Sequence, residues 1–378
     1  MAPREALSIE GLRASARRRL PRFIFEYIDG GADDEITLRR NRQGFEDIVF
    51  NPRVVVDISK RTLSTTLLGG PAAMPLAIAP TGMAAIACPD GEVALARAAK
   101  AHGIPFTLST QSSFSIERVA EEGGRLWFQL YPFRDRDLVS SLIKRALDAG
   151  YEALILTVDV PVPANREKDR RNGFAVPMNI TPRLAFDVAT HPAWGLGLLR
   201  HGMPGLANIP GAELFKGRGT SSAAVGATLD PSLSWDDIAR FRALWPKPLV
   251  IKGVLSADDA RKAVEVGFDA IVVSNHGGRQ LDGAPATIEA LPDVVEAAGG
   301  KAEVLIDSGI RRGSDIAKAV ALGAKGAFIG RPTLYGLATG GQAGAHHALA
   351  LLRAELHRTL SLIGCANVAD LGRHNLRS

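Results

Sequence analysis

The sequence predicts an α/β fold: a (β/α)8 barrel, or TIM barrel, with an N-terminal helical extension and a long insertion after strand 4. Eight short apolar segments recur from about residue 75 onward, and helical patterns separate them. The segments are continuously apolar rather than alternating, which is typical of strands buried on both faces. Because strand and helix alternate eight times, we expect a closed parallel barrel.

The expected strands are apolar runs that end in or near a polar residue. They are PLAIAP (75–80), PFTLST (105–110), LWFQLY (126–131), ALILTVD (153–159), PLVIKG (248–253), AIVVSN (270–275), EVLIDSG (303–309) and GAFIGR (326–331). An open doubly wound sheet is the alternative, but it usually has fewer strands and a glycine-rich phosphate loop after the first. The segment APTGMAA, which follows the first strand, does not match that loop.

Three of the intervening helices carry end signals. Asp90 is placed as the N-cap of one helix, and Gly103 lies just past its end. Ser256 and Ser314 are placed as the N-caps of two later helices, each followed by a terminating glycine. Such side-chain oxygens accept hydrogen bonds from the free N–H groups at a helix start, and glycine readily adopts the left-handed conformation that ends a helix.

The chain is expected to form one domain (residues 1–378) around a barrel of residues 75–365. An N-terminal extension, residues 1–74, has helical patterns around 8–30 and should cover part of the barrel mouth or base. The gap between strands four and five is far longer than the others, so residues 160–233 form an insertion. Loops this long are commonly lids or binding surfaces.

Composition limits the class of protein. The 378 residues are 46% hydrophobic, enough for a large core, and the net charge of +5 suits an anionic ligand or membrane surface. We expect no nucleic acid partner, because there is no dense basic tract or RNA-binding motif. Cys88 and Cys365 lie far apart in no metal-like spacing, which favours a reducing compartment and no metal site.

The N-terminus predicts no secretory signal peptide, because no apolar segment follows the basic stretch ASARRRL. No apolar run reaches the length of about 18 residues that a membrane-spanning helix needs. We therefore expect a cytoplasmic protein, and contact with the inner face of the cell membrane stays open.

Polar or charged groups stand at or near the end of every expected strand. Chemistry in such barrels takes place at these carboxyl ends. The groups are Thr81, Ser109, Gln129, Tyr131, Thr157, Asp159, Lys252, Ser274, His276, Arg279, Asp307 and Arg331. Solubility of strand ends would explain one or two of them, whereas the complete ring indicates a functional site.

Two of these strand ends favour a phosphate site. The segments DSGIRRG and IGRP follow strands seven and eight, where barrels of this kind commonly bind phosphate. Gly309 lets the backbone approach closely, and Arg311 and Arg331 can supply bidentate contacts. Capped helices with exposed arginines would explain either motif alone. A further group suits the polar edge of a flat heterocycle, where a lysine could stabilise a reduced ring: Ser109, Gln129, Thr157 and Lys252.

Several segments resemble the FMN-dependent L-2-hydroxy acid oxidases and dehydrogenases. They are SNHGGRQLDGAPAT, LTVDVP, APTGM, FQLY, DSGIRRGSDI and IGRPTLYGLA. The resemblance runs from LPRFIFEYIDGGADDE (20–35) to IGC (363–365), nearly the whole chain. Within the family, ATHPAWGLGLLRHGMPGLANI most resembles the insertion of the mandelate dehydrogenases and membrane L-lactate dehydrogenases, where it is linked to the membrane surface.

The resemblance implies catalytic roles for residues of the strand ends. His276 would be the base, since its pKa can be placed near neutral. Asp159 would orient the imidazole and stabilise its protonated form. Tyr131 would contact the substrate hydroxyl.

Further residues would bind the substrate. Arg279 and Arg166 would hold its carboxylate, because a guanidinium matches a carboxylate bidentately. Tyr27 would hydrogen-bond the same carboxylate from the N-terminal extension. Gly82 stands where short-chain oxidases tend to carry alanine, and the missing methyl leaves space for a bulkier substrate side chain.

The cofactor that the resemblance implies is FMN. Its expected contacts are Pro80, Thr81, Gly82, Ser109, Gln129, Thr157, Lys252, Ser274, Asp307, Ser308, Gly309, Arg311, Gly330 and Arg331. Ser308 replaces a glycine of some relatives, which should matter little if the backbone is the donor. The family also implies a homo-oligomer, a tetramer.

The sequence therefore predicts an FMN-dependent L-2-hydroxy acid dehydrogenase, of mandelate or lactate type, that passes electrons to a quinone or another carrier. A soluble oxidase that passes electrons to O2 and makes H2O2 is the alternative. Other FMN barrels, such as isopentenyl-diphosphate isomerase-like or IMP dehydrogenase-like enzymes, lack the His-x-x-Arg pair. A non-enzymatic flavin-binding protein would not need the base and both arginines together.

The middle of the insertion, about 183–210, has two interpretations. It has the apolar side chains and cations of a segment that binds an anionic membrane surface, or it is a lid over the barrel mouth. The apolar residues are Trp194, Leu196, Leu198, Leu199, Met203 and Leu206. The cations are Arg183 and Arg200, with His191 and His201 as further candidates.

Overall fold

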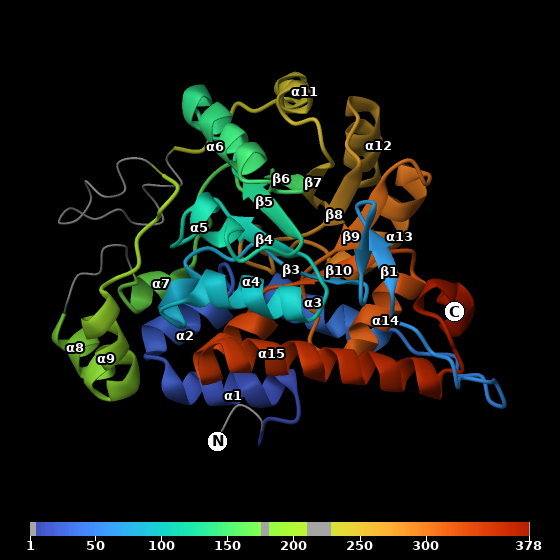
Figure 1. The fold of residues 1–378 in the computed structure, drawn as a ribbon, viewed down its shortest axis with the longest axis horizontal. Helices are drawn as coiled ribbons and strands as arrows, with labels where there is room; N and C mark the ends of the chain where they lie inside the picture. The colour runs from blue at the N-terminus through green and yellow to red at the C-terminus, as the bar shows by residue number, and fades with distance from the viewer. Residues whose placement is uncertain (1–4, 175–180, 210–227, 378) are drawn as a thin grey trace.

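The computed structural model describes residues 5–174, 181–209 and 228–377, which form a closed barrel of eight parallel strands surrounded by helices (Figure 1). The strand order is β10-β3-β4-β5-β6-β7-β8-β9. The strands are β3 (Leu76–Ile78), β4 (Phe106–Ser109), β5 (Leu126–Leu130), β6 (Ala153–Thr157), β7 (Leu249–Val254), β8 (Ala270–Val273), β9 (Glu303–Ile306) and β10 (Gly326–Ile329). Each strand falls on one predicted segment and ends up to three residues earlier or one residue later than predicted, so the predicted barrel is confirmed.

One helix follows each strand on the outside of the barrel. These helices are α4 (Gly91–Ala101), α5 (Ile116–Ala120), α6 (Arg136–Asp148), α11 (Trp235–Leu244), α12 (Ala257–Val266), α13 (Thr287–Ala298), α14 (Gly313–Ala321) and α15 (Arg331–Leu362). Ser256 caps α12 as predicted, by accepting a hydrogen bond from the N–H of Asp259. The prediction for Ser314 is wrong: α14 begins at Gly313, so the N-cap is Arg312, two residues earlier. The carboxylate of Asp315 accepts from the backbone N–H groups of Arg311 and Arg312.

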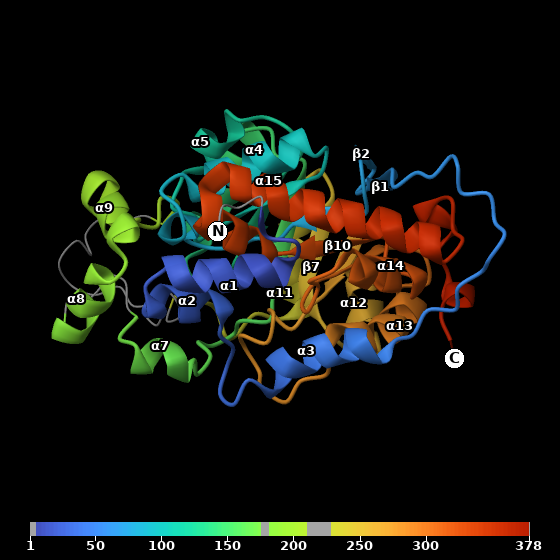
Figure 2. The ribbon, with the colours of Figure 1, turned by 90° about the horizontal axis from the view of Figure 1, so that it is seen from below.

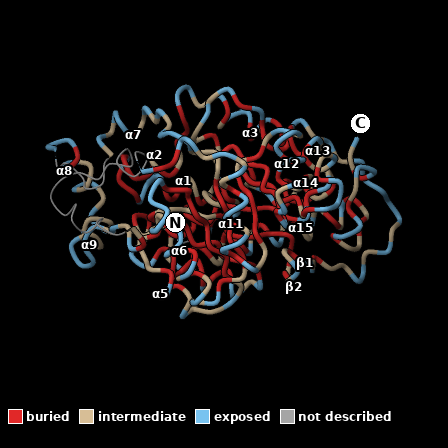
Figure 3. Tube along the Cα trace, turned by 90° about the horizontal axis from the view of Figure 1, so that it is seen from above, coloured by how far each residue is buried: buried red, intermediate tan, exposed pale blue. Residues whose placement is uncertain are grey.

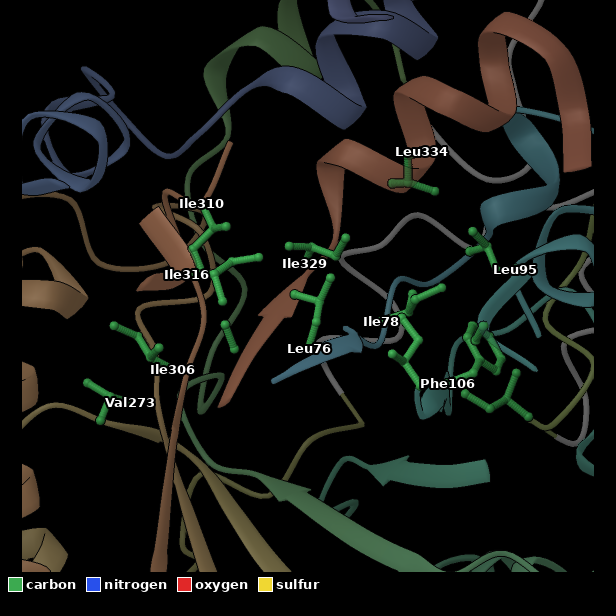
Figure 4. Close-up of a cluster of buried hydrophobic side chains, with 14 of the residues drawn as sticks. Leu76, Ile78, Leu95, Phe106, Val273, Ile306, Ile310, Ile316, Ile329 and Leu334 are labelled. Carbon is green, nitrogen blue, oxygen red and sulfur yellow. The ribbon is translucent and has the colours of Figure 1, made fainter. Parts of the chain in front are cut away.

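The strands are mostly apolar, which agrees with the burial of both of their faces. Inside the barrel, Trp127, Ile155, Val272 and Phe328 belong to one cluster. On the outer face, side chains such as Ile78, Phe106, Ile306 and Ile329 pack with helix residues that include Leu95 and Ile316 (Figure 4). A strand with two buried faces cannot alternate polar and apolar residues, which explains the pattern seen in the sequence.

The N-terminal extension covers both ends of the barrel. Its hairpin, β1 (Thr65–Leu67) and β2 (Gly70–Ala72), places Leu67 and Ala72 in the cluster inside the barrel. Its helices α1 (Ile9–Arg19), α2 (Arg22–Asp29) and α3 (Ile36–Asp47) pack around α15 and the loops at the other end (Figure 2). The sequence predicted that the extension covers part of the barrel mouth or base, and in the structure it covers parts of both.

The insertion carries three short helices in its described parts: α7 (Glu167–Arg171), α8 (Pro182–Ala189) and α9 (Pro192–His201). Helices α8 and α9 form one end of the molecule, next to α2, and much of their surface is exposed (Figures 1 and 3). Trp194 of α9 packs edge-on against Phe23 of α2, with ring centroids 5.8 Å apart. Among the described residues, no helix is long and apolar enough to cross a membrane.

The start of α14 depends on close packing against α15. A Cβ at Gly313 would lie 2.1 Å from the backbone nitrogen of Leu356. We expect Gly313→Ala to lower the free energy of unfolding by about 1–3 kcal/mol, the usual cost of overpacking. Gly197→Ala is the control, because a Cβ there would meet only Pro89, at 3.9 Å. Thermal unfolding followed by circular dichroism measures both, and equal stabilities would contradict the prediction.

Candidate active site

A cavity of about 440 Å³ opens at the carboxyl ends of the strands. The predicted site residues that line it are Tyr27, Pro80, Thr81, Gly82, Tyr131, Arg166, Lys252, His276, Arg279, Asp307, Ser308, Gly309, Arg311, Gly330 and Arg331. The other predicted residues are Ser109, Gln129, Thr157 and Ser274, which are buried at the ends of their strands, and Asp159, which contacts His276. The fold therefore brings all the predicted residues to one end of the barrel.

His276, which follows β8, and Asp159, which follows β6, form a hydrogen-bonded pair across the end of β7, the strand between them. Nδ1 of His276 lies 3.0 Å from Oδ1 of Asp159. The His276 backbone has a φ of +57°, and its N–H donates to Oγ of Ser274, which fixes the turn. Gly253, with a φ of +112°, makes room for the pair, because a Cβ there would lie 2.6 Å from Cβ of Asp159. The carboxylate holds Nδ1, so Nε2 is available to a substrate.

Lys252 places a buried positive charge in the floor of the cavity. Its Nζ donates to Oγ of Ser274 at 2.8 Å and lies 3.2 Å from Oδ2 of Asp307 and 4.0 Å from Oδ2 of Asp159. Burial by itself would lower the pKa of Lys252, but the two carboxylates outweigh it and raise that pKa. Burial likewise opposes ionisation of Asp159, yet the charges of His276 and Lys252 hold its pKa below the usual value. The floor is therefore ionic, with Lys252 as its cation.

Tyr27, Arg166 and Arg279 form a compact group on another wall. Cζ of Arg279 lies 5.0 Å from the centre of the Tyr27 ring, and Cζ of Arg166 lies 5.2 Å from it. The Tyr27 ring also stacks on Phe174, with centroids 4.1 Å apart. Burial and the neighbouring charge of Arg166 lower the pKa of Arg279. Two cations this close, in a cavity wall, suit an anionic ligand.

Asp169 is a buried acid beside these arginines that the sequence reasoning missed. Its Oδ2 lies 3.1 Å from Nη1 of Arg166, close enough for an ion pair but without the geometry of a hydrogen bond. Burial raises the pKa of Asp169, although Arg166 and Arg279 oppose the shift. A signal was available in the sequence, because Asp169 follows Arg166 at the i,i+3 spacing of helical ion pairs.

Arg331 and Arg311 occupy the expected phosphate corner. The guanidinium of Arg331 donates to the backbone carbonyls of Ile28, Gly277 and Gly30 at 2.8–3.0 Å. Burial lowers its pKa to about 10. Nη1 of Arg311 donates to the carbonyl of Ile310, and its guanidinium lies 6.0 Å from the Tyr335 ring centre. Arg331 thus joins two backbone segments at the cavity wall, the end of α2 and the loop that contains Gly277.

Ser308 has a larger structural role than its sequence position suggested. Its Oγ accepts from the N–H of Gly277 at 2.9 Å and donates to Oδ1 of Asp307 at 2.7 Å. The hydroxyl thereby links the loop of His276 to the acid beside Lys252. A glycine at 308 would leave both partners without this contact.

Several buried polar atoms in the floor of the active-site cavity lack a hydrogen-bond partner, and they bear on whether the floor suits a flavin. Nε2 of Gln129, Oγ1 of Thr157 and Oγ1 of Thr81 are buried and have no hydrogen-bond partner in the described chain. Buried polar groups normally find partners, so free donors next to a charged lysine favour a bound polar heterocycle. Within the described residues, no cluster of three His, Cys, Asp or Glu side chains could hold a metal. The unpaired polar atoms beside Lys252 fit the polar edge of a flavin.

The chain was compared with known proteins. It matches the FMN-dependent dehydrogenase family over residues 16–378. It is 44% identical over 377 residues to (S)-mandelate dehydrogenase of Pseudomonas putida, covering 98% of this chain and 94% of the relative. It is 48% identical over 361 residues to L-lactate oxidase of a Nostoc species, covering 94% of each.

Solved structures agree with these relatives. The crystal structure of a monotopic membrane protein, (S)-mandelate dehydrogenase, superposes with a TM-score of 0.93 at 43% identity, covering 98% of this chain and 99% of that one. A mandelate oxidase superposes with a TM-score of 0.85 at 38% identity, with 98% of each chain covered. Fold, cavity and sequence lead to the same assignment: the chain belongs to the FMN-dependent dehydrogenase family and is an FMN-dependent oxidoreductase acting on CH–OH groups.

Proposed function

We propose that this enzyme oxidises an L-2-hydroxy acid of mandelate or lactate type to the 2-oxo acid and passes the electrons to a quinone or another carrier at a membrane surface. The observation that carries the proposal is one cavity that holds both a base and an anion site. The His276–Asp159 pair and the arginines 166 and 279 line or border it. A 2-hydroxy acid presents a carboxylate next to the carbon that loses hydrogen, so it requires both.

The proposed chemistry begins at Nε2 of His276. With Nδ1 held by Asp159, Nε2 accepts the proton that the substrate loses, and Asp159 stabilises the resulting imidazolium. FMN, when bound, supplies the acceptor for the two electrons. Gln129, Thr157 and Lys252 would hold the polar edge of its ring, with the phosphate near Gly309 and Arg311. The buried charge of Lys252 favours added electron density at that edge.

The substrate carboxylate would lie between Arg166, Arg279 and Tyr27. Both guanidinium groups line the cavity, and they flank the tyrosine ring. Tyr131 would contact the substrate hydroxyl. Burial raises the pKa of Tyr131, so its phenol keeps its proton and can donate a hydrogen bond.

The size of the substrate side chain is expected to depend on Gly82. A Cβ there would lie 3.0 Å from Cβ of Gln111, so an alanine would push against the neighbouring wall. The glycine keeps this part of the cavity open. This supports a substrate with a bulky side chain, as in the mandelate type.

The membrane part of the proposal rests on α8 and α9. Phe186 and Leu199 are 72% and 84% exposed, and Leu196 and Met203 are also exposed. Exposed large apolar side chains with nearby Arg183 and Arg200 are typical of a surface that binds anionic lipid. A soluble oxidase that uses O2 is the alternative, and a relative of that kind, the L-lactate oxidase, matches this chain.

The base can be tested with His276→Ala. We expect flavin reduction by L-mandelate or L-lactate to slow at least about 10²–10⁴-fold, the usual contribution of a general base. FMN content should stay unchanged, because the imidazole pairs with Asp159 and not with the phosphate corner. Anaerobic stopped-flow absorbance measures the reduction. A near-normal rate in the variant would remove His276 from this role.

Asp169 should make substrate binding pH-dependent. Burial raises its pKa, so at low pH it is neutral and Arg166 carries an uncompensated charge, whereas rising pH ionises it and weakens the attraction for the substrate anion. KM should therefore rise with pH. Asp169→Asn should remove this rise and lower KM at pH 8 about three- to tenfold, as for loss of a weak ion pair.

The control for Asp169→Asn is Glu167→Gln, which changes an exposed acid of the same helix that pairs with Arg171. It should leave the pH dependence of KM unchanged. The measurement is KM and kcat from pH 5.5 to 8.5. A parallel rise of KM in wild type and Asp169→Asn would contradict the prediction.

Membrane binding can be tested with Leu199→Asp. The charge should release the enzyme from anionic phosphatidylglycerol vesicles, because an aspartate resists both the apolar layer and the headgroup charge. Leu362→Asp is the matched control, since Leu362 is 70% exposed at the far end of α15 (Figures 1 and 2). Sedimentation with vesicles at low salt measures binding. If wild type stays in the supernatant, the membrane proposal fails and the soluble oxidase becomes the favoured function.

A further inference from the structure

A second cavity, of about 750 Å³, lies between α9 and the barrel, and we refer to it as the α9 cavity. Three parts of the fold form its walls: the loop 85–89 that follows β3, the inner side of α9, and the stretch 337–341 around the kink of α15. The end of α1, at 18–20, closes another side. The cavity is thus built between the exposed helices of the insertion and the body of the enzyme.

The α9 cavity and the active-site cavity share one lining residue. Ile86 lines both of them. The wall is held in place by Trp194 of α9, whose Nε1 donates to the carbonyl of Ile86 at 2.8 Å. Ile86 itself is buried and packs in the main core. A molecule in the α9 cavity would therefore lie one side chain away from the cavity in which substrate oxidation takes place.

The lining of the α9 cavity is mixed in character. Apolar side chains such as Phe114, Trp194 and Leu198 contribute to it, and so do polar groups such as Ser113 and His191. Oγ of Ser113 is buried and has no hydrogen-bond partner among the described residues, so its hydroxyl can donate to an oxygen atom of a ligand. Such a lining suits a flat ring with polar oxygens better than a plain hydrocarbon chain.

The cavity also adjoins the surface proposed to bind lipid. Gly197 and Leu198 line it, while the next residue of α9, Leu199, is exposed on the outside. A ligand with an apolar tail could keep its ring in the cavity and its tail at the membrane surface. From the outside inward, the exposed apolar surface is thus followed by the α9 cavity and then by the active-site cavity.

We propose that the α9 cavity binds the ring of a lipophilic quinone, which takes up the electrons across the wall formed by Ile86. The proposal rests on the proposed hydroxy acid oxidation and names the place of its electron acceptor. The hydroxy acid loses two electrons and two protons, from its C–H and O–H groups. FMN carries the electrons, and the quinone gains two electrons and two protons to become the quinol. Its two protons come from water.

The proposal is tested with substitutions in α9 that fill the α9 cavity. Gly197→Phe places a ring in it without changing a residue that lines the active-site cavity, and Gly197→Ala is the matched control, since a Cβ there has free space. Ala193→Phe, also on α9, is an independent second variant. Ubiquinone-1 is the probe. Its binding to the oxidised holoenzyme is measured by equilibrium dialysis, which requires no turnover.

Both phenylalanine variants should bind ubiquinone-1 at least about tenfold more weakly than wild type, a change of about 1.4 kcal/mol. Reoxidation of the reduced enzyme by ubiquinone-1, measured anaerobically, should slow to a similar extent. Reoxidation by ferricyanide, FMN content and flavin reduction by substrate should match those of Gly197→Ala. These unchanged properties would show that the substitutions affect the α9 cavity and not the active site.

Two results would overturn the inference. One is unchanged binding of ubiquinone-1 in both phenylalanine variants. The other is a wild-type enzyme that binds decanoate but no ubiquinone-1, which would make the cavity an acyl-chain site. A failure of the proposed function would appear as absence of flavin reduction by any L-2-hydroxy acid. The dialysis result does not depend on that reaction, so the two failures can be distinguished.

Discussion

The active site depends on two buried guanidinium groups that bind the carboxyl end of α2. Arg279 donates to the carbonyls of Tyr27 and Gly30, and Arg331 donates to those of Ile28 and Gly30. The last carbonyls of a helix have no partner within it and carry partial negative charge, so they are good acceptors for buried cations. This contact holds the N-terminal extension over the barrel mouth and places Tyr27 in the cavity wall.

In the active site, one buried acid can also serve two charged neighbours. Asp159 faces His276 on one side and Lys252 on the other, so a single carboxylate orients the base and balances the lysine. Removing it would leave a buried cation with fewer partners, as well as an unfixed imidazole, so its loss should cost both stability and catalysis. On the opposite wall, Asp169 moderates the paired arginines. Acid and base chemistry can then proceed in one cavity without free buried charge.

The insertion extends the molecule beyond the barrel mouth. Helices α8 and α9 project beside α2 and leave their outer apolar side chains exposed (Figures 2 and 3). Trp194 connects α9 to the wall residue Ile86 by a hydrogen bond and to Phe23 by ring packing. The surface proposed for lipid is thereby fixed to the cavity proposed for catalysis.

The sequence by itself determined the barrel and most of the site residues, because strands buried on both faces need continuous apolar runs and their ends carry the chemistry. His276, Asp159, Lys252 and the arginines were found from these positions and from family resemblance. Tertiary structure alone decided which partners they have. It showed that Arg331 binds backbone carbonyls, that Ser308 joins two loops, and that Ile86 lines two cavities. These contacts join residues far apart in the chain, and no local pattern encodes them.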